Sequence, residues 1–123
     1  MLRNDFYTVG KIEKEGLSIK TSLYLTVDHP LYQGHFPARP VVPGVCMLQM
    51  IKELTELATG RALQLSTART MKFLLPIVPA DTPTLQVGIT WQMPDPSSVE
   101  INATLLKDNS PCFKFSGIFR IVD

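Results

Sequence analysis

One segment of the chain, residues 44–59, has the composition of a long α-helix. VCMLQMIKELTELAT (45–59) contains neither proline nor glycine and is rich in good helix formers. Gly60 follows at the position where a helix commonly ends in a left-handed residue. The first half of the segment is apolar almost all round, whereas Lys52, Glu53 and Glu56 make the second half amphipathic, with a solvated face. We therefore expect one helix whose first half is enclosed on every side.

The rest of the chain has the alternation and the turn residues of β-strands. Two strands that form a hairpin are expected at Phe6–Glu13 and Leu17–Val27. Four more are expected at Leu63–Leu75, which has room for a bulge, Thr84–Gln92, Ser98–Lys107 and Cys112–Val122. One apolar helix with these strands predicts the α+β class, with an antiparallel six-stranded sheet wrapped around one long central helix. A length of 123 residues predicts a single domain, 1–123.

The composition excludes several kinds of function. The chain is 45% hydrophobic and 19% charged with a net charge of +1, which indicates neither disorder nor nucleic-acid binding. Cys46 and Cys112 lack the spacing of a zinc site or a disulfide framework. The N-terminus lacks the pattern of a signal peptide, and no run of about 18 apolar residues predicts a membrane span. We expect a soluble cytoplasmic protein that uses no metal and no cofactor.

A proline-rich segment, residues 28–43, precedes the helix. Its prolines exclude a long helix or a central strand there, and they place His35 on a stiff loop directly before the helix. Gly44 offers an N–H group that no side chain shields. A carbonyl group at this point would be polarised by that N–H and by the positive end of the helix. The pattern therefore predicts a site centred on His35 and the start of the helix.

Residues 34–45, GHFPARPVVPGV, resemble the active-site signature GHFPxxPxxPGV of the 3-hydroxyacyl-[acyl-carrier-protein] dehydratases. Residues 73–81, FLLPIVPAD, are similar to a second segment of that family, F-(K/R)-(K/R)-P-V-x-P-G-D. The resemblance implies a hotdog fold and a lyase of fatty acid biosynthesis that dehydrates 3-hydroxyacyl thioesters. It implies that His35 is the general base. It also implies substrate contacts at Phe36, Pro43, Gly44 and Val45.

The chain departs from the resembled family at Gln49. The family has a carboxylate fourteen residues after its histidine, and here that position is an amide. An amide does not deliver a proton as a carboxylic acid does, although it can hydrogen-bond a hydroxyl or orient a water. Two interpretations of Gln49 stay open, a catalytic side chain facing the substrate and a buried amide paired with backbone or a dimer mate. At a second departure, Leu74 and Leu75 replace basic residues that would meet an acidic carrier protein.

Three functional hypotheses follow. The first is a dehydratase of 3-hydroxyacyl thioesters carried by acyl carrier protein or coenzyme A. The second is a non-catalytic or partner-dependent acyl-thioester-binding subunit, because Gln49 replaces the acid. The third, a thioesterase, is favoured least because those enzymes do not share the segment at 34–45. The resemblance also implies a homodimer, a higher oligomer of dimers or a heterodimer, with His35 of one chain facing Gln49 of its mate. His29 matches no catalytic position and is expected to be structural or exposed.

Overall fold

The computed structural model describes residues 1–32 and 40–123. These residues contain one long helix, α1 (Gly44–Thr59), one 3₁₀ turn, η1 (Pro30–Tyr32), and a seven-stranded sheet. The strands are β1 (Tyr7–Val9), β2 (Glu13–Glu15), β3 (Ser18–Leu25), β4 (Leu63–Phe73), β5 (Thr84–Asp95), β6 (Ser98–Lys107) and β7 (Ser110–Ile121). No helix in these two ranges is long and apolar enough to cross a membrane.

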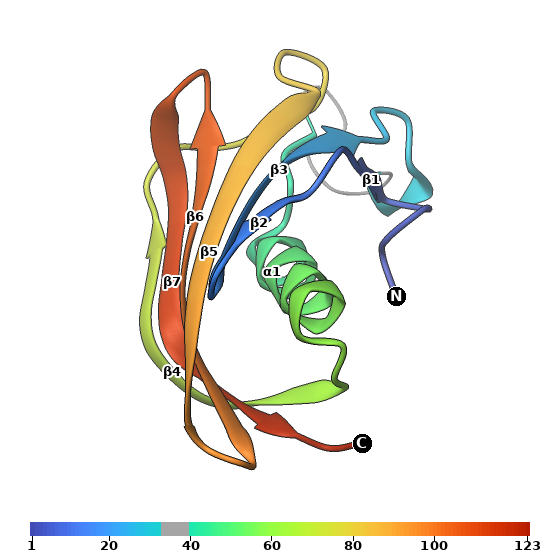
Figure 1. Cartoon of the computed structure of the whole chain (residues 1–123). Helices are drawn as coiled ribbons and strands as arrows, with labels where there is room; N and C mark the ends of the chain where they lie inside the picture. Colours follow the sequence, from blue (N-terminus) through green and yellow to red (C-terminus); the bar gives the residue numbers. More distant parts are fainter. Residues whose placement is uncertain (33–39) are drawn as a thin grey trace.

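The strands form one antiparallel sheet that curves around α1 (Figure 1). Their order is β1-β3-β5-β6-β7-β4, with β2 also paired to β3. The predicted α+β architecture is therefore confirmed, but the expected six strands are seven. The difference arises around the first predicted strand, which is shorter than expected and forms only β1, while β2 begins at its last residue, Glu13, and extends into the segment expected to be the turn. These two short strands pair with opposite ends of β3, with Tyr7 opposite Leu25 and Glu13 opposite Lys20.

The predicted element boundaries are close to those of the structure. Helix α1 covers the predicted range, and Gly60 ends it in the left-handed conformation with φ 70°. Strand β6 also has its predicted bounds, whereas β5 continues three residues further, to Asp95. Strand β4 ends at Phe73, and its pairing with β7 shifts register twice, which confirms the expected bulge. Gly60 therefore predicted the end of α1, whereas Pro94 and Pro111 lie within β5 and β7 and do not mark their ends.

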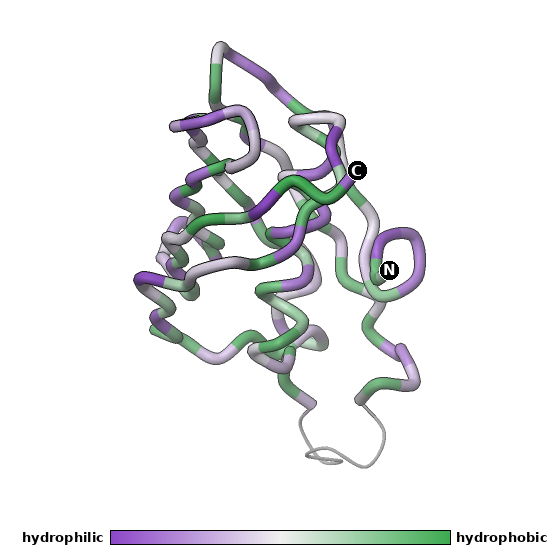
Figure 2. Tube along the Cα trace, turned by 90° about the horizontal axis from the view of Figure 1, so that it is seen from below, coloured by the Kyte–Doolittle hydropathy of each residue, from purple (hydrophilic) through white to green (hydrophobic). Residues whose placement is uncertain are grey.

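The core lies between α1 and the concave face of the sheet. Hydrophobic and hydrophilic residues alternate along much of the chain (Figure 2). In β3, β5, β6 and β7 buried residues alternate with more exposed ones, so these four strands turn one row of side chains toward the helix. Met50, Ile51 and Leu54 of α1 are fully buried in one cluster with apolar residues of the strands, among them Leu85 and Phe113. This packing fixes the rotation of α1, and thereby decides which of its faces remains open.

Two expectations about α1 are wrong. The first half is not enclosed on every side, since Val45 is 78% exposed. The second half is not simply solvated, because Glu53 is only 2% exposed. The reason is tertiary, because residues 2–7 pack against the second half of the helix, where the Glu53 carboxylate accepts hydrogen bonds from them. A contact between positions about fifty residues apart leaves no trace in helical periodicity.

Candidate active site

The two segments that carry the resemblance meet at the N-terminal end of α1. Val42 N–H donates a 2.9 Å hydrogen bond to the Ile77 carbonyl, and both side chains are buried. The Phe73 ring lies against Gly44, so closely that a methyl group on Gly44 would be 2.8 Å from the nearest ring carbon. Stretches thirty residues apart in the chain therefore form one structural unit around the start of the helix.

The start of α1 offers unpaired backbone donors. Pro43 is the N-cap residue, in an extended conformation, and it provides no side-chain cap. Its carbonyl accepts the N–H groups of Cys46 and Met47 at 3.0 and 3.2 Å. The N–H groups of Gly44 and Val45 donate no hydrogen bond to any residue in the described ranges. Two free donors at the positive end of a helix dipole are suited to stabilising a developing negative charge on a carbonyl oxygen.

Gln49 lies one helical turn beyond Val45, on the same face of α1. Val45 is exposed and Gln49 is half-buried, so this face is not covered by the chain's own sheet. The Gln49 amide Nε2 donates a 2.7 Å hydrogen bond to Glu53 Oε2, one further turn along the helix. Gln49 therefore has a side-chain partner within its own helix, which neither earlier interpretation included.

Glu53 is a buried carboxylate surrounded by donors. Oε2 accepts the N–H of Leu2 at 2.8 Å and the Gln49 amide, while Oε1 accepts the N–H of Arg3 at 2.8 Å and the Tyr7 hydroxyl at 3.1 Å. Burial alone would raise the pKa of Glu53, but these four hydrogen bonds outweigh it and hold the pKa below its usual value. Burial and the adjacent carboxylate raise the pKa of the Tyr7 hydroxyl. Glu53 is thus ionised and saturated, and it is not suited to delivering a proton.

The structure places only some of the predicted site residues. His35 and Phe36 lie outside the described residues. Pro43 and Gly44 form the start of α1, and Val45 and Gln49 lie on its open face. Sequence reasoning did not find Glu53 as a site residue, although its spacing of four from Gln49 was a usable signal.

His29 and Cys46, to which the sequence assigned no catalytic role, lie where their side chains contribute to the fold. His29 Nδ1 accepts the Leu31 N–H at 3.0 Å, and His29 Nε2 lies 3.1 Å from the Asp5 carboxylate. Cys46 is buried, and burial raises the pKa of its thiol, so it stays protonated. Neither side chain is placed as a nucleophile or base.

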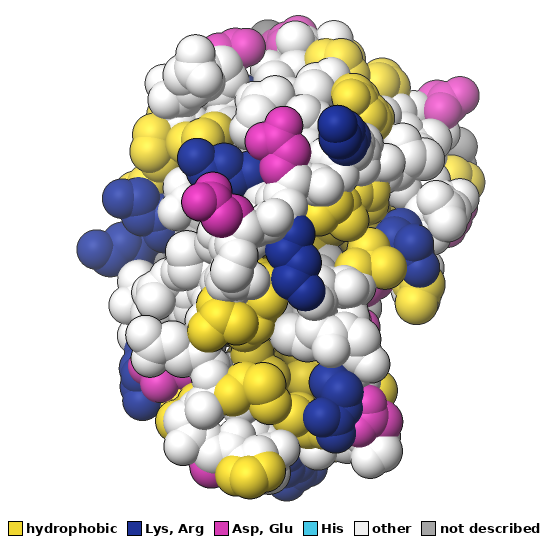
Figure 3. Space-filling model, in the orientation of Figure 1, with side chains coloured by type: hydrophobic (Ala, Val, Ile, Leu, Met, Phe, Trp, Pro, Cys, Tyr) yellow, Lys and Arg dark blue, Asp and Glu magenta, His cyan; other side chains and the backbone are white. Residues whose placement is uncertain are grey.

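The edge of the sheet at β4 is open and partly apolar. Beyond Leu63 its residues are exposed or half-buried, and Leu65, Met71 and Phe73 are more than one third exposed. On the face of the molecule seen in Figure 3, hydrophobic side chains are exposed between interspersed basic and acidic ones. Arg69 on this strand pairs with Glu100 on β6. Of the two basic residues of this strand, Arg69 and Lys72, Arg69 is therefore paired within the sheet.

A single helix held in the curve of an antiparallel sheet, with the helix N-terminus as the candidate site, defines the hotdog class. The solved dehydratase heterocomplex ApeI:P from Xenorhabdus doucetiae has this fold, with a TM-score of 0.73 and 19% identity over 93% of this chain and 97% of that one. The PaaI protein of E. coli superposes with a TM-score of 0.65 and 13% identity over 92% and 79% of the two chains. These similarities establish the fold.

The chain belongs to the ApeI-like dehydratase family, whose model matches residues 11–113. Curated relatives are named 3-hydroxyacyl-[acyl-carrier-protein] dehydratase FabZ. The protein from Anaeromyxobacter dehalogenans is 33% identical over 78 residues, which are 55% of this chain and 50% of the relative. The protein from Caulobacter sp. is 25% identical over 108 residues, 80% of this chain and 56% of the relative. The chain spans about half the length of the curated relatives it matches.

Proposed function

We propose that this protein dehydrates 3-hydroxyacyl thioesters, carried by acyl carrier protein or coenzyme A, in fatty-acid-type synthesis. One observation carries the proposal: the segments that resemble the dehydratase signature, around Gly44 and Phe73, come together at the start of α1. The family to which the chain belongs, and the names of its curated relatives, support the same chemistry.

The proposed reaction begins with His35 as general base. Its imidazole removes a proton from the carbon next to the thioester carbonyl, and the negative charge moves onto the carbonyl oxygen. The N–H groups of Gly44 and Val45 stabilise that oxygen. The electron pair then forms the carbon–carbon double bond as the β-hydroxyl leaves. The leaving hydroxyl takes the proton that His35 removed, so that water is released and the imidazole is again neutral. A positioned base typically contributes about 10²–10⁴ in rate, and removal of one oxyanion donor costs about 10²–10³.

Substrate contacts are assigned on the same basis. Phe36 and Pro43 would flank the thioester, and the acyl chain would run along the apolar side of α1. Gln49 would hydrogen-bond the β-hydroxyl. The half-buried position of Gln49 on the open face of the helix supports this role.

We propose a dimer as the working form, a homodimer that could assemble further or a heterodimer. The exposed β4 edge presents unpaired backbone groups and apolar side chains, which a second hotdog subunit would cover. In such an arrangement, His35 of one chain faces Gln49 of its mate, because the open face of α1 turns away from its own sheet. Sedimentation at micromolar concentration tests this, and a monomer would contradict it.

The activity is tested by following enoyl thioester formation from 3-hydroxybutyryl carrier protein and from 3-hydroxybutyryl coenzyme A. His35→Ala should lower kcat/KM by about 10²–10⁴. His29→Ala is the matched control, because the structure places His29 among Asp5 and Leu31. It should leave the activity of the folded protein unchanged. Absence of turnover by wild type, alone and with candidate partner subunits, would reject the proposal.

A second candidate function, a partner-dependent acyl-binding subunit, is favoured by the Gln49–Glu53 pair. The amide has no acidic proton, and the adjacent carboxylate is ionised and saturated, so neither supplies a general acid. The solved neighbour from Xenorhabdus doucetiae is itself a heterocomplex. Assays of the protein alone and co-expressed with a hotdog protein that has a carboxylate at the position of Gln49 separate the two functions. Activity only in the mixture supports the second candidate.

A further inference from the structure

The hydrogen bond from Gln49 to Glu53 fixes which end of the amide faces inward. An ionised carboxylate accepts hydrogen bonds and donates none, so only the Nε2 end of the amide can face it. The two atoms are 2.7 Å apart, a short distance typical of a bond to a charged acceptor. Rotating the amide by 180° would place Oε1 against the carboxylate. The hydrogen bond would then be lost, and the lone pairs of the two oxygens would repel each other.

Glu53 itself has no freedom to turn away. Leu2 N–H, Arg3 N–H and the Tyr7 hydroxyl hold its two oxygens from three other directions. With 2% exposure, the residue has almost no water to replace these partners. The orientation of the Gln49 amide is therefore set by a rigid buried group.

The opposite end of the amide, Oε1, is left as a free acceptor. It accepts no hydrogen bond from residues 1–32 or 40–123. Since Nε2 is turned toward the buried Glu53, Oε1 is turned away from it, on the half-buried face that Gln49 shares with exposed Val45. An acceptor at this point favours a ligand group that donates a hydrogen and disfavours one that presents only lone pairs.

We propose that Glu53 is a positioning residue that presents the Gln49 oxygen to the substrate, so that the site selects a 3-hydroxyacyl over a 3-oxoacyl group. The inference rests on the proposed function. A hydroxyl on the β-carbon donates to Oε1, whereas a ketone there would place two acceptor oxygens in contact. A site that hydrogen-bonds a hydroxyl discriminates against analogues that lack it, because its own polar group then stays unpaired.

The test uses two pantetheine amides, in which nitrogen replaces the thioester sulfur, one bearing a 3-hydroxybutanoyl and the other a 3-oxobutanoyl group. Their dissociation constants are measured by calorimetry for wild type, Glu53→Gln, Gln49→Ala and Tyr7→Phe. Wild type should prefer the hydroxy ligand, and Glu53→Gln should lower that preference about 10-fold, the worth of one hydrogen bond to a neutral group. Gln49→Ala should lower it equally, and adding Glu53→Gln to Gln49→Ala should change it no further.

Tyr7→Phe is the matched control, because it removes a donor to Glu53 Oε1 and leaves the bond between Gln49 and Oε2 in place. It should keep the preference of wild type even where it lowers stability. A folded Glu53→Gln protein that keeps the preference for the hydroxy ligand would overturn the role of Glu53 but not the proposed function. Failure of wild type to bind either ligand would overturn the proposed function, and the role of Glu53 with it.

If Glu53→Gln does not fold, NMR of the wild-type protein tests whether Glu53 holds the Gln49 amide. The Gln49 side-chain amide signal, identified by its loss in Gln49→Ala, should have one proton shifted downfield by the carboxylate. It should also exchange slowly with solvent. A signal like that of a free glutamine amide would overturn the proposal.

Discussion

The two ends of α1 differ in how completely their backbone groups are satisfied. At the C-terminal end, Gly60 closes the helix in the left-handed conformation with its N–H on the Glu56 carbonyl at 2.8 Å. Lys14 Nζ reaches the Ala58 carbonyl at 3.2 Å. At the N-terminal end, the N–H groups of Gly44 and Val45 are without partners in the described residues.

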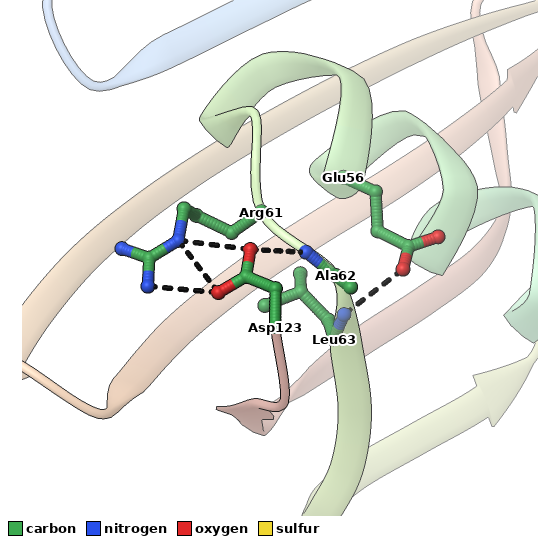
Figure 4. A network of polar contacts seen from close by, with 5 residues as sticks. All are labelled: Glu56, Arg61, Ala62, Leu63 and Asp123. Atoms are coloured by element: carbon green, nitrogen blue, oxygen red, sulfur yellow. Dashed lines mark hydrogen bonds and ion pairs between the residues drawn. The ribbon is translucent and has the colours of Figure 1, made fainter.

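The chain that follows the C-terminal end is also held. Figure 4 shows the Asp123 carboxylate between the Arg61 guanidinium and the Ala62 N–H, with the Glu56 carboxylate on the Leu63 N–H. The polar groups at one end of the helix are therefore satisfied within the chain, whereas two N–H groups at the other end have no partner among the described residues. Binding groups are commonly found at such less completely satisfied ends of a rigid scaffold. The same kind of substitution should accordingly have opposite effects at the two ends.

Among the substitutions that compare the two ends of α1, the largest effect is expected from Gly44→Ala. The added methyl would meet the Phe73 ring at 2.8 and 2.9 Å and would occupy space beside the free N–H groups. We expect kcat/KM to fall about 10²-fold, as when an oxyanion donor is removed. Stability should change little, because Gly44 has no positive φ and alanine favours a helix. Steady-state kinetics and thermal unfolding check this, and unchanged kinetics would remove Gly44 from the site.

A rate increase of about 10-fold is expected from Gln49→Glu if the chain is a dehydratase that lacks its acid. The introduced carboxyl would lie beside Glu53, and two carboxyls in contact share a proton, so its pKa in the folded state is raised. The gain should be present at low pH and should be lost as pH rises through that pKa. The free energy of unfolding should also fall as pH rises, because the pKa of the introduced glutamate is lower in the unfolded chain, about 4.3. Rates and melting temperatures between pH 5 and 8 measure both.

Two further variants control this experiment. Adding His35→Ala to Gln49→Glu should abolish the gain. The exchange Gln49→Glu with Glu53→Gln keeps one carboxyl and one amide in the pair, so the stability of that protein should depend less on pH. An unchanged rate in a folded Gln49→Glu protein would contradict the missing-acid explanation and favour the partner-subunit function.

At the other end of the helix, Gly60→Ala should destabilise the protein without affecting its kinetics. Gly60 has φ 70°, and no atom lies within 4 Å of the position of an added methyl, so the cost is backbone strain alone. We expect a loss of about 1 kcal/mol in the free energy of unfolding. Urea denaturation measures it, with Gly44→Ala as the paired variant. A lower kcat in Gly60→Ala would show that the two ends are coupled.

The smallest effect is expected from Asp123→Asn, which weakens an exposed ion pair. Hydrogen bonds from Arg61 and Ala62 hold the pKa of the Asp123 carboxyl below its usual value. The ion pair therefore stabilises the fold fully at pH values above the pKa that Asp123 has in the unfolded chain. This stabilisation is lost as pH falls through the lower pKa of Asp123 in the folded protein. The difference in melting temperature between wild type and variant should shrink toward pH 3 and in high salt. A difference independent of pH would mean that charge plays no part.

Local patterns were sufficient to predict α1, the four strands that follow it and the residue that ends the helix. Residues 34–45 and 73–81 were matched to two segments of one family, but it is the structure that brings Val42 and Gly44 together with Ile77 and Phe73 at the start of α1. Local patterns did not predict β2, because its sequence, Glu13–Glu15, is charged and exposed throughout, so it lacks the alternation of a half-buried strand. They assigned Glu53 to a solvated face because its partners, Leu2, Arg3 and Tyr7, are distant in sequence.

The contact between Glu53 and the chain near residue 3 uses backbone N–H groups, which every residue except proline possesses. Natural variation at position 3 is therefore free to change the charge and size of the side chain without loosening this anchor. Proline is the one substitution that removes the donor. The side chain at position 3 can therefore vary while Glu53 beneath it is kept. We expect an alignment of relatives to show a variable residue at position 3 and an invariant one at position 53.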